Sequence, residues 1–324
     1  MADIQPSTDQ TLSNISTNVR HFMWNDDYIE LLSHKLDLQK VRTLVDIGSG
    51  SGLLSGIFAI YMRAGATVHG FDLDEAAVRE AQARVRQNPY SVNFEFEVAD
   101  AHALPMETDS ADMAICHHVL VHVADPAAIL KEMIRVVRPG GKVVVFEPNT
   151  IVQALVLNSV EDDYSLAQRL DLVRYQYYYE HGKALLGEGD DSIGDHLPRL
   201  FLEAGLTEIE VRLSDKAGAL VPPYDSKEKQ ARVSELLSWL DAYEQNRDFI
   251  RTCFLKGGGT PEEFERFSAW EIEQNQRVRK QIADETFIHP GGMLTYIVMG
   301  RVPGDVSPKS QVPGLKSELS PYQA

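Results

Sequence analysis

Short apolar runs alternate with helically spaced segments between residues 41 and 138. The run at 41–47 is apolar almost throughout, which is typical of a strand buried on both faces of a parallel sheet. Alternation of this kind predicts βαβ units and an α/β fold. We expect strands at 41–47, 67–71, 92–98, 113–116 and 142–146, and helices at 53–63, 75–87 and 126–137.

Longer helical segments follow residue 147. A helix is expected at 161–183, and its spacing places four residues on one face: Leu166, Leu170, Val173 and Tyr177. Further helices are expected at 193–204, at 225–256, where three glycines follow, and after Thr260, which begins a capping sequence. Strands at 208–213 and 293–301 bring the number of strands to seven.

These elements divide the chain into a core and two helical additions. We expect a helical cover at 1–40, an α/β core at 41–150, a helical segment at 151–205, the end of the sheet at 206–302 with an insertion at about 225–288, and a disordered Pro- and Ser-rich tail at 303–324. The core of the insertion is expected to contain Trp239, Phe264, Phe267 and Trp270. Both helical segments are candidate lids, because open α/β sheets bind ligands at the carboxyl edge.

Composition narrows the class of protein. The 324 residues include 31 Lys and Arg against 48 Asp and Glu, a formal charge of −17. That acidic balance, without any basic run, argues against a nucleic acid partner. Two cysteines cannot build a disulfide framework or a cysteine zinc site. No apolar run approaches the roughly 18 residues of a membrane span, and the start lacks a secretory pattern, so we expect a cytoplasmic protein.

The strongest chemical signal is a glycine-rich turn where the first strand meets the first helix. It reads Asp46-Ile47-Gly48-Ser49-Gly50-Ser51-Gly52. Glycines at alternate positions allow a sharp bend and close approach of a ligand, while the helix start leaves N–H donors unpaired. The third glycine comes one position too early for a dinucleotide fingerprint. Taken alone, the turn is equally consistent with a tight connection that binds nothing.

Polar groups follow the next strands at the same edge. Asp72 ends the second strand, where a carboxylate can accept hydrogen bonds from a ribose diol. Asp100-Ala101 follows the third strand and His117-His118 the fourth. Four polar strand ends in a row predict a nucleoside pocket.

The region 44–147 resembles the class I S-adenosylmethionine-dependent methyltransferases. The matching features are the glycine turn, Asp72, Asp100-Ala101 followed by Leu104-Pro105, the segment 119–123, and Arg138-Pro139-Gly140-Gly141. Asn25-Asp26-Asp27-Tyr28 and Phe146-Glu147-Pro148 also resemble a subgroup of bacterial-type small-molecule methyltransferases. One departure is Val121, where many members of the class carry a glutamate. The resemblance implies a seven-stranded Rossmann-like methyltransferase sheet with helical lid insertions, and S-adenosylmethionine as cofactor.

The resemblance also implies roles for individual residues. The cofactor's methionine part would lie against Gly48, Ser49, Gly50 and Gly52, with its ammonium near Asp46 and its other end closed by the His117 backbone. The ribose would bind Asp72, and the adenine would contact Leu73, Asp100 and Ala101. Tyr28 would cover the sulfonium side.

A hydroxyl or protonated amine acceptor requires a base, and histidine is the usual choice near neutral pH. The candidates at the acceptor side are His118, His122 and Asn149. His118 and His122 would share a face of a helix, but the glutamate of a zinc-protease motif is missing, so we expect no metal. The alternative for His122 is a hydrogen-bonded structural residue.

Two further features allow more than one interpretation. The run Tyr175 to Glu180 could enclose a cationic or amine substrate, although tyrosines at this spacing are expected mostly to pack. For the whole chain we expect methyl transfer to O or N of a small molecule. The alternatives are a methyltransferase of protein substrates, a catalytically silent cofactor-binding regulator and, less favoured by the glycine spacing, a nicotinamide oxidoreductase.

Overall fold

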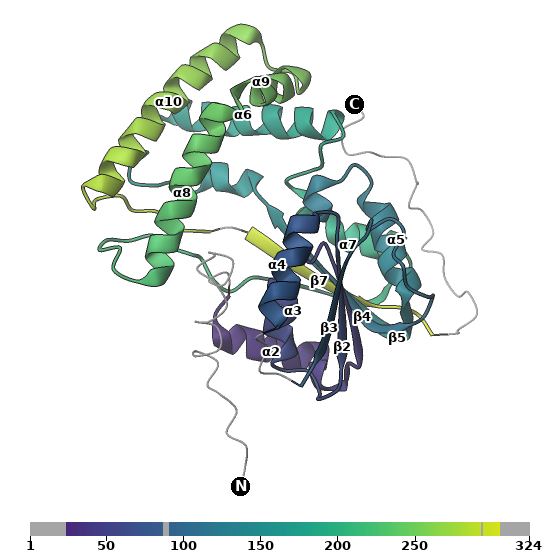
Figure 1. The fold of residues 1–324 in the computed structure, drawn as a ribbon. Coiled ribbons are helices and arrows are strands. Elements are labelled where there is room, and N and C mark those ends of the chain that lie inside the picture. The colour runs from purple at the N-terminus through teal and green to yellow at the C-terminus, as the bar shows by residue number, and fades with distance from the viewer. Residues whose placement is uncertain (1–23, 87–90, 293, 305–324) are drawn as a thin grey trace.

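The computed structural model of the chain describes residues 24–304, except 87–90 and 293. Its centre is a seven-stranded sheet in the order β3-β2-β1-β4-β5-β7-β6 (Figure 1). The strands are β1 (Thr43–Ile47), β2 (Thr67–Asp72), β3 (Asn93–Val98), β4 (Ala111–His117), β5 (Val137–Asn149), β6 (Thr207–Leu213) and β7 (Leu294–Arg301). The seven predicted strands are therefore confirmed, with boundaries that move by a few residues.

The strand order reverses between β1 and β4. The chain proceeds from β1 outward to β2 and β3, and then returns to pair β4 with the other side of β1. The first five strands are parallel, and β7 runs antiparallel to both β5 and β6. A ligand pocket is expected at the carboxyl ends of β1 and β4, because helices that leave on opposite faces open a crevice there.

Alternate residues of the strands pack against helices on the two faces. Leu44 and Ile115 point to the face covered by α2 (Asp26–Leu36) and α3 (Leu53–Ala59). Val45 and Cys116 point to the face covered by α5 (Pro126–Val136) and α7 (Ile193–Glu203). Near the β3 edge, α4 (Glu75–Val85) packs on Phe96. Burial on both faces explains why these strands are almost continuously apolar.

A separate helical layer lies beyond one end of the sheet (Figure 1). It consists of α6 (Leu166–Leu185), α8 (Lys227–Gln245), α9 (Arg247–Lys256) and α10 (Pro261–Ala283). Its centre is an aromatic cluster around Phe254, Phe264 and Phe267. The chain reaches this layer from β5 through a short 3-10 helix, η4 (Ile151–Leu155). The layer therefore begins at the carboxyl edge of the sheet.

The helices α6 and α9 touch through their backbones. A Cβ added at Gly182 would lie 1.6 Å from the Cys253 carbonyl oxygen, and one at Gly257 would lie 1.8 Å from that of Tyr178. Atoms cannot approach so closely without displacement, so any larger residue at either position would push the helices apart.

The structure corrects several details of the helical layer. The segment 225–256 is two helices rather than one, because the chain turns at Asn246, whose side chain donates to the carbonyl of Ala242. Trp239 is not part of the core, since 68% of its surface is exposed. The predicted apolar face of α6 is also exposed at Leu166 and Leu170, because the cluster packs against Tyr175 and Tyr178 instead.

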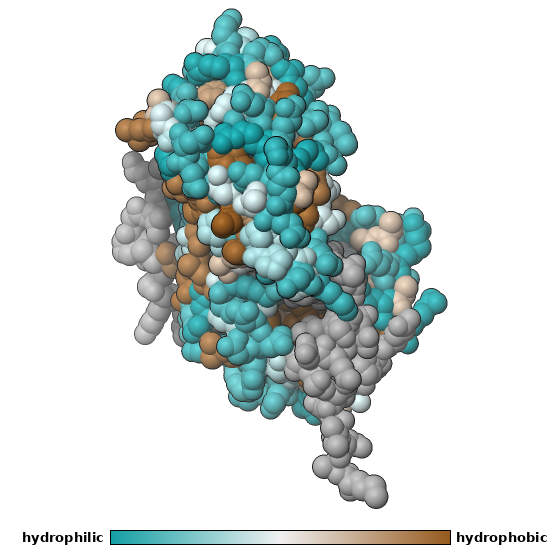
Figure 2. Space-filling view, turned by 90° about the vertical axis from the view of Figure 1, so that its left-hand side faces the viewer, coloured by the Kyte–Doolittle hydropathy of each residue, from teal (hydrophilic) through white to brown (hydrophobic). Residues whose placement is uncertain are grey.

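The surface is mainly polar, in keeping with the charge of the chain. In Figure 2 the upper part of the face shown is largely hydrophilic, and apolar side chains gather across its middle. Within the described residues, every helix is too short or too polar to span a bilayer. The expected tail at 303–324 lies almost entirely outside these residues, as does most of the expected cover at 1–40.

Phe254 should be essential for the helical layer. It is fully buried and contacts the rings of Tyr175, Phe264 and Phe267. We expect Phe254→Ala to lower the free energy of unfolding by about 3–5 kcal/mol, through lost burial and the cavity left behind. The control Trp239→Ala should change it by less than about 0.5 kcal/mol, because the ring is exposed. Urea unfolding followed by circular dichroism measures both, and equal effects would contradict the assignment of the core.

Candidate active site

The glycine turn joins β1 to α3 as predicted, and its three glycines do different things. Gly48, Gly50 and Gly52 all have positive φ angles, of 64°, 51° and 71°. A Cβ on Gly48 would lie 2.1 Å from Val119, and one on Gly52 would lie 2.8 Å from Phe96. A Cβ on Gly50 would meet nothing within 4 Å. Two glycines therefore permit internal packing, and Gly50 faces open space.

Two polar side chains lie beneath this turn. The Ser49 hydroxyl oxygen is buried and has no hydrogen-bond partner among the residues described. Asp46 is buried on the α3 face of the sheet and accepts a hydrogen bond from the Ser55 hydroxyl. Burial raises the pKa of Asp46 to about 7, and the nearby Asp72 carboxylate adds to this rise, while the bond from Ser55 opposes it. Near neutral pH, a neighbouring cation would favour the ionised form of Asp46.

Asp72 lies at the tip of β2 and faces the glycine turn. One carboxylate oxygen accepts from the Gly50 N–H at 2.7 Å, and the other accepts from the Asp74 N–H at 2.9 Å. The next residue, Leu73, leaves 70% of its surface exposed. A half-buried carboxylate next to an exposed apolar side chain suits a sugar attached to a flat base.

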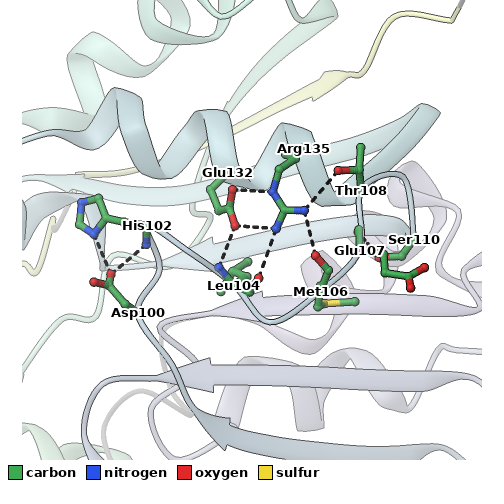
Figure 3. Close-up of polar contacts among 9 residues, drawn as sticks. All are labelled: Asp100, His102, Leu104, Met106, Glu107, Thr108, Ser110, Glu132 and Arg135. Carbon is green, nitrogen blue, oxygen red and sulfur yellow. Dashed lines mark hydrogen bonds and ion pairs between the residues drawn. The ribbon is translucent and has the colours of Figure 1, made fainter.

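The loop after β3 holds Asp100 and Ala101 on the same side. Asp100 accepts from the His102 N–H at 2.9 Å and from the ring Nδ1 at 2.7 Å (Figure 3). These bonds hold the pKa of the Asp100 carboxyl below its usual range. The Asp100 side chain is exposed, so it is available to an adenine edge.

A buried-side network fixes the rest of that loop. Arg135 of α5 pairs with Glu132 at 2.6 Å and donates to the Met106 carbonyl at 2.8 Å, while Glu132 accepts from the Leu104 N–H at 2.7 Å (Figure 3). The network ties the loop to α5 on both sides of Pro105, and therefore fixes where Asp100 and Ala101 emerge.

The two histidines at the tip of β4 are stacked. Their ring centroids are 4.3 Å apart, and His117 also packs against Trp24, at 5.3 Å. His118 has a φ angle of 54°, which few non-glycine residues adopt, and its N–H donates to the Phe146 carbonyl. Such outliers cluster at functional sites, because the surrounding structure must hold them in place.

The remaining candidates lie in different surroundings. His122 ends a 3-10 turn, η3 (Leu120–His122), and is exposed, so it does not share a helical face with His118. Asn149 is buried at the end of β5, and its amide donates to Asp195 of α7 at 2.6 Å. The Tyr28 hydroxyl donates to the Leu213 carbonyl of β6, the opposite edge strand from β3.

Glu147 is a site residue to which the sequence analysis gave no role. Its side chain is fully buried near the end of β5. One carboxylate oxygen accepts from the N–H groups of Val119 and Leu120 at 2.8 and 2.7 Å, and the other from Val121 at 3.4 Å. Burial raises the pKa of Glu147 to about 8, and the three N–H bonds oppose that rise. An acid flanked by Phe146 and Pro148 at a buried strand end was the available signal.

The described residues fit the nucleoside cofactor that the sequence resemblance implies. The open space at Gly50 and the unpartnered Ser49 hydroxyl would accommodate its amino acid part. Asp72 and the exposed Leu73 would meet its sugar and base. No group of three or more potential metal ligands occurs in the part of the chain that the structure describes.

Comparison with known proteins agrees with this fit. A family model described as a methyltransferase domain matches residues 38–195. A ubiquinone biosynthesis O-methyltransferase of Xanthomonas oryzae is 30% identical over 209 residues, which cover 64% of this chain and 78% of that protein. An uncharacterized 37.1 kDa protein in a transposon of Streptomyces fradiae is 34% identical over 178 residues, 55% of this chain and 47% of that one. The match thus spans about half of the transposon protein.

Among solved structures, a putative methyltransferase from Bacillus halodurans has a TM-score of 0.48 and 16% identity, with 86% of this chain and all of that one covered. The family match and the Xanthomonas relative both include the glycine turn region and most of the sheet. The chain therefore belongs to the class I S-adenosylmethionine-dependent methyltransferases.

Proposed function

We propose that the protein transfers a methyl group from S-adenosylmethionine to a hydroxyl group of a small molecule. The observation that carries this proposal is the strained turn at His118, which presents an imidazole directly after β4, next to the glycine turn. Relatives named as ubiquinone biosynthesis O-methyltransferases favour oxygen over nitrogen as the acceptor atom. The net charge of −17 disfavours a polyanionic acceptor.

The proposed cofactor contacts follow the carboxyl edge of the sheet. Gly48, Ser49, Gly50 and Gly52 would surround the amino acid part, and the Asp46 carboxylate would favour its ammonium. Asp72 would bind the ribose, with Leu73, Asp100 and Ala101 about the adenine. Tyr28 and the His117 backbone would close the methionine side. When bound, the cofactor supplies a methyl group on a positively charged sulfur, which is lost readily to a nucleophile.

The work of the protein is alignment and removal of a proton. Alignment of two reactants can contribute up to about 7–11 kcal/mol in favourable cases. We assign His118 as the base that takes the acceptor's hydroxyl proton as the new oxygen–carbon bond forms, and His122 as the second candidate. Asn149 is assigned a positioning role, because its amide is already bonded to Asp195.

The first test is turnover with labelled S-adenosylmethionine against simple acceptors: a catechol, a phenol, a primary amine and a basic peptide. We expect label in the catechol or phenol. Transfer to the peptide alone would contradict the small-molecule proposal, and binding of the cofactor without transfer to any metabolite extract would favour a silent regulator.

His118→Asn tests the assignment of the base. Asparagine tolerates a positive φ angle but cannot take a proton near neutral pH. We expect kcat to fall by about 10²–10⁴-fold, the usual contribution of a general base. Affinity for S-adenosylhomocysteine, measured by calorimetry, should stay within about twofold. If His122→Asn shows the large loss and His118→Asn does not, the two roles are exchanged.

Asp72→Ala tests the ribose contact. Loss of charge-assisted hydrogen bonds should weaken S-adenosylhomocysteine binding by about 1–3 kcal/mol. The matched control is Asp241→Ala, which removes an exposed carboxylate paired with Arg279 on the helical layer. Calorimetric titration should show no change for the control, and an unchanged affinity in Asp72→Ala would remove this residue from the site.

Glu147→Ala should be harmful because it leaves three buried N–H groups without their acceptor. We expect a loss of about 3 kcal/mol in the free energy of unfolding, on the scale of unsatisfied buried groups. Glu147→Gln should lose less, since its carbonyl can still accept from Val119 and Leu120. Urea unfolding measures both, and equal losses would show that the cavity, rather than the missing acceptor, is responsible.

A further inference from the structure

Glu180 is a buried acid on the inner side of α6 that the proposed reaction does not use. Only 2% of its surface is exposed. One carboxyl oxygen, Oε1, accepts from the side chains of Gln176 and, at 3.4 Å, Thr150. Thr150 directly follows β5. Glu180 therefore lies where the helical layer meets the carboxyl edge of the sheet.

The second oxygen of Glu180 faces another acid. Oε2 is buried and accepts no hydrogen bond from the residues described. Its neighbour is the carboxyl group of Asp191, with which Glu180 interacts both electrostatically and by a side-chain hydrogen bond. Two ionised carboxylates cannot bond to each other, so one of the pair must carry a proton.

The neighbouring charges identify which acid carries it. Lys183, one turn along α6, forms a close ion pair with Asp191, which favours the ionised form of Asp191. The other titratable groups that affect this cluster are Tyr179 of α6 and Cys253 of α9, both neutral in ordinary conditions. Glu180 has no such ion pair among the residues described, so the proton belongs there. Burial and Asp191 accordingly hold the pKa of Glu180 well above its usual range.

Asp191 belongs to the loop 186–192, which touches the acceptor side of the site. The Asp191 carbonyl accepts from the Thr150 N–H at 2.9 Å, and the Asp190 N–H donates to the Val121 carbonyl at 3.1 Å. A Cβ on Gly189 would lie 2.1 Å from that same Val121 oxygen and 2.9 Å from the His122 backbone. The position of this loop thus sets the position of η3.

We propose that Glu180 is a positioning residue that keeps its proton at neutral pH and donates it in a hydrogen bond to Asp191, which holds the loop 186–192 against η3. The structural part of this inference stands by itself. Its consequence for methyl transfer rests on the proposed function, because η3 carries His122 and follows His118.

The sign of the stability effect follows from this assignment. A carboxyl group that stays protonated in the folded protein, but ionises in the unfolded chain, costs stability as the pH rises from about 4.5 to its folded pKa. Glu180→Gln replaces the protonated acid by a neutral donor of the same shape. We therefore expect its urea midpoint to exceed that of the native protein at about pH 8, and the difference to vanish near pH 4.

The direct test is carbon NMR of the full chain labelled at the glutamate side-chain carboxyl. One resonance should be absent from Glu180→Gln and should remain at the protonated position in the native protein above about pH 7. In Asp191→Asn that resonance should titrate at lower pH, since the competing carboxylate is gone. The control Glu188→Gln removes an exposed acid of the same loop and should leave the resonance unchanged.

Turnover with S-adenosylmethionine and the accepted catechol or phenol tests the positioning role. We expect Glu180→Gln to keep kcat within about twofold near pH 7 and to lose the alkaline decline that ionisation of Glu180 causes in the native protein. A missing resonance that titrates between about pH 4 and 5 would overturn the proposal. So would a folded Glu180→Gln with a tenfold loss of kcat near neutrality, a failure of this variant to fold, or identical pH profiles. If no acceptor is methylated, the proposed function fails, while the NMR and unfolding results still decide the protonation.

Discussion

The acceptor side of this molecule depends on a single buried carboxylate. Glu147 sits on β5, yet all three of its hydrogen bonds go to backbone N–H groups of the segment that follows β4. Those N–H groups begin a 3-10 turn only three residues long, which has too few internal bonds to stand alone. With the carboxylate in place, the chain leaves β4 in a fixed direction, Val119 packs on Gly48, and His118 is held in a rare backbone conformation. The glycine turn and the proposed base are therefore coupled through one side chain.

Most of the sheet could be predicted from the sequence because its signals are local. A strand buried on both faces reads as a continuous apolar run, and the glycine turn, Pro126 and Thr260 mark helix boundaries by their own chemistry. The tips of β1 to β4 come together at one edge, as the parallel arrangement requires. The cofactor residues named from the sequence lie along this edge, and their individual roles remain predictions.

The sequence was less informative where contacts join distant segments. Nothing in the pattern of α6 distinguishes the exposed face at Leu166 and Leu170 from the packed face at Tyr175 and Tyr178, because both are apolar and only the partner helix decides. The same holds for Trp239, and for the break at Asn246, which interrupts an otherwise helical stretch. Glu147 was overlooked for a related reason: its partners lie 26 to 28 residues earlier, and no local spacing reveals them.

The close approach of α6 and α9 constrains how this enzyme can admit its substrate. Because Gly182 and Gly257 bring the two backbones into direct contact, neither helix can slide or tilt without carrying the other with it. Any opening of the helical layer must then be a swing of both helices as one rigid piece, with the bending confined to the connections that run back to the sheet. In an evolving family, substrate choice could change through those connections while the paired helices stayed the same.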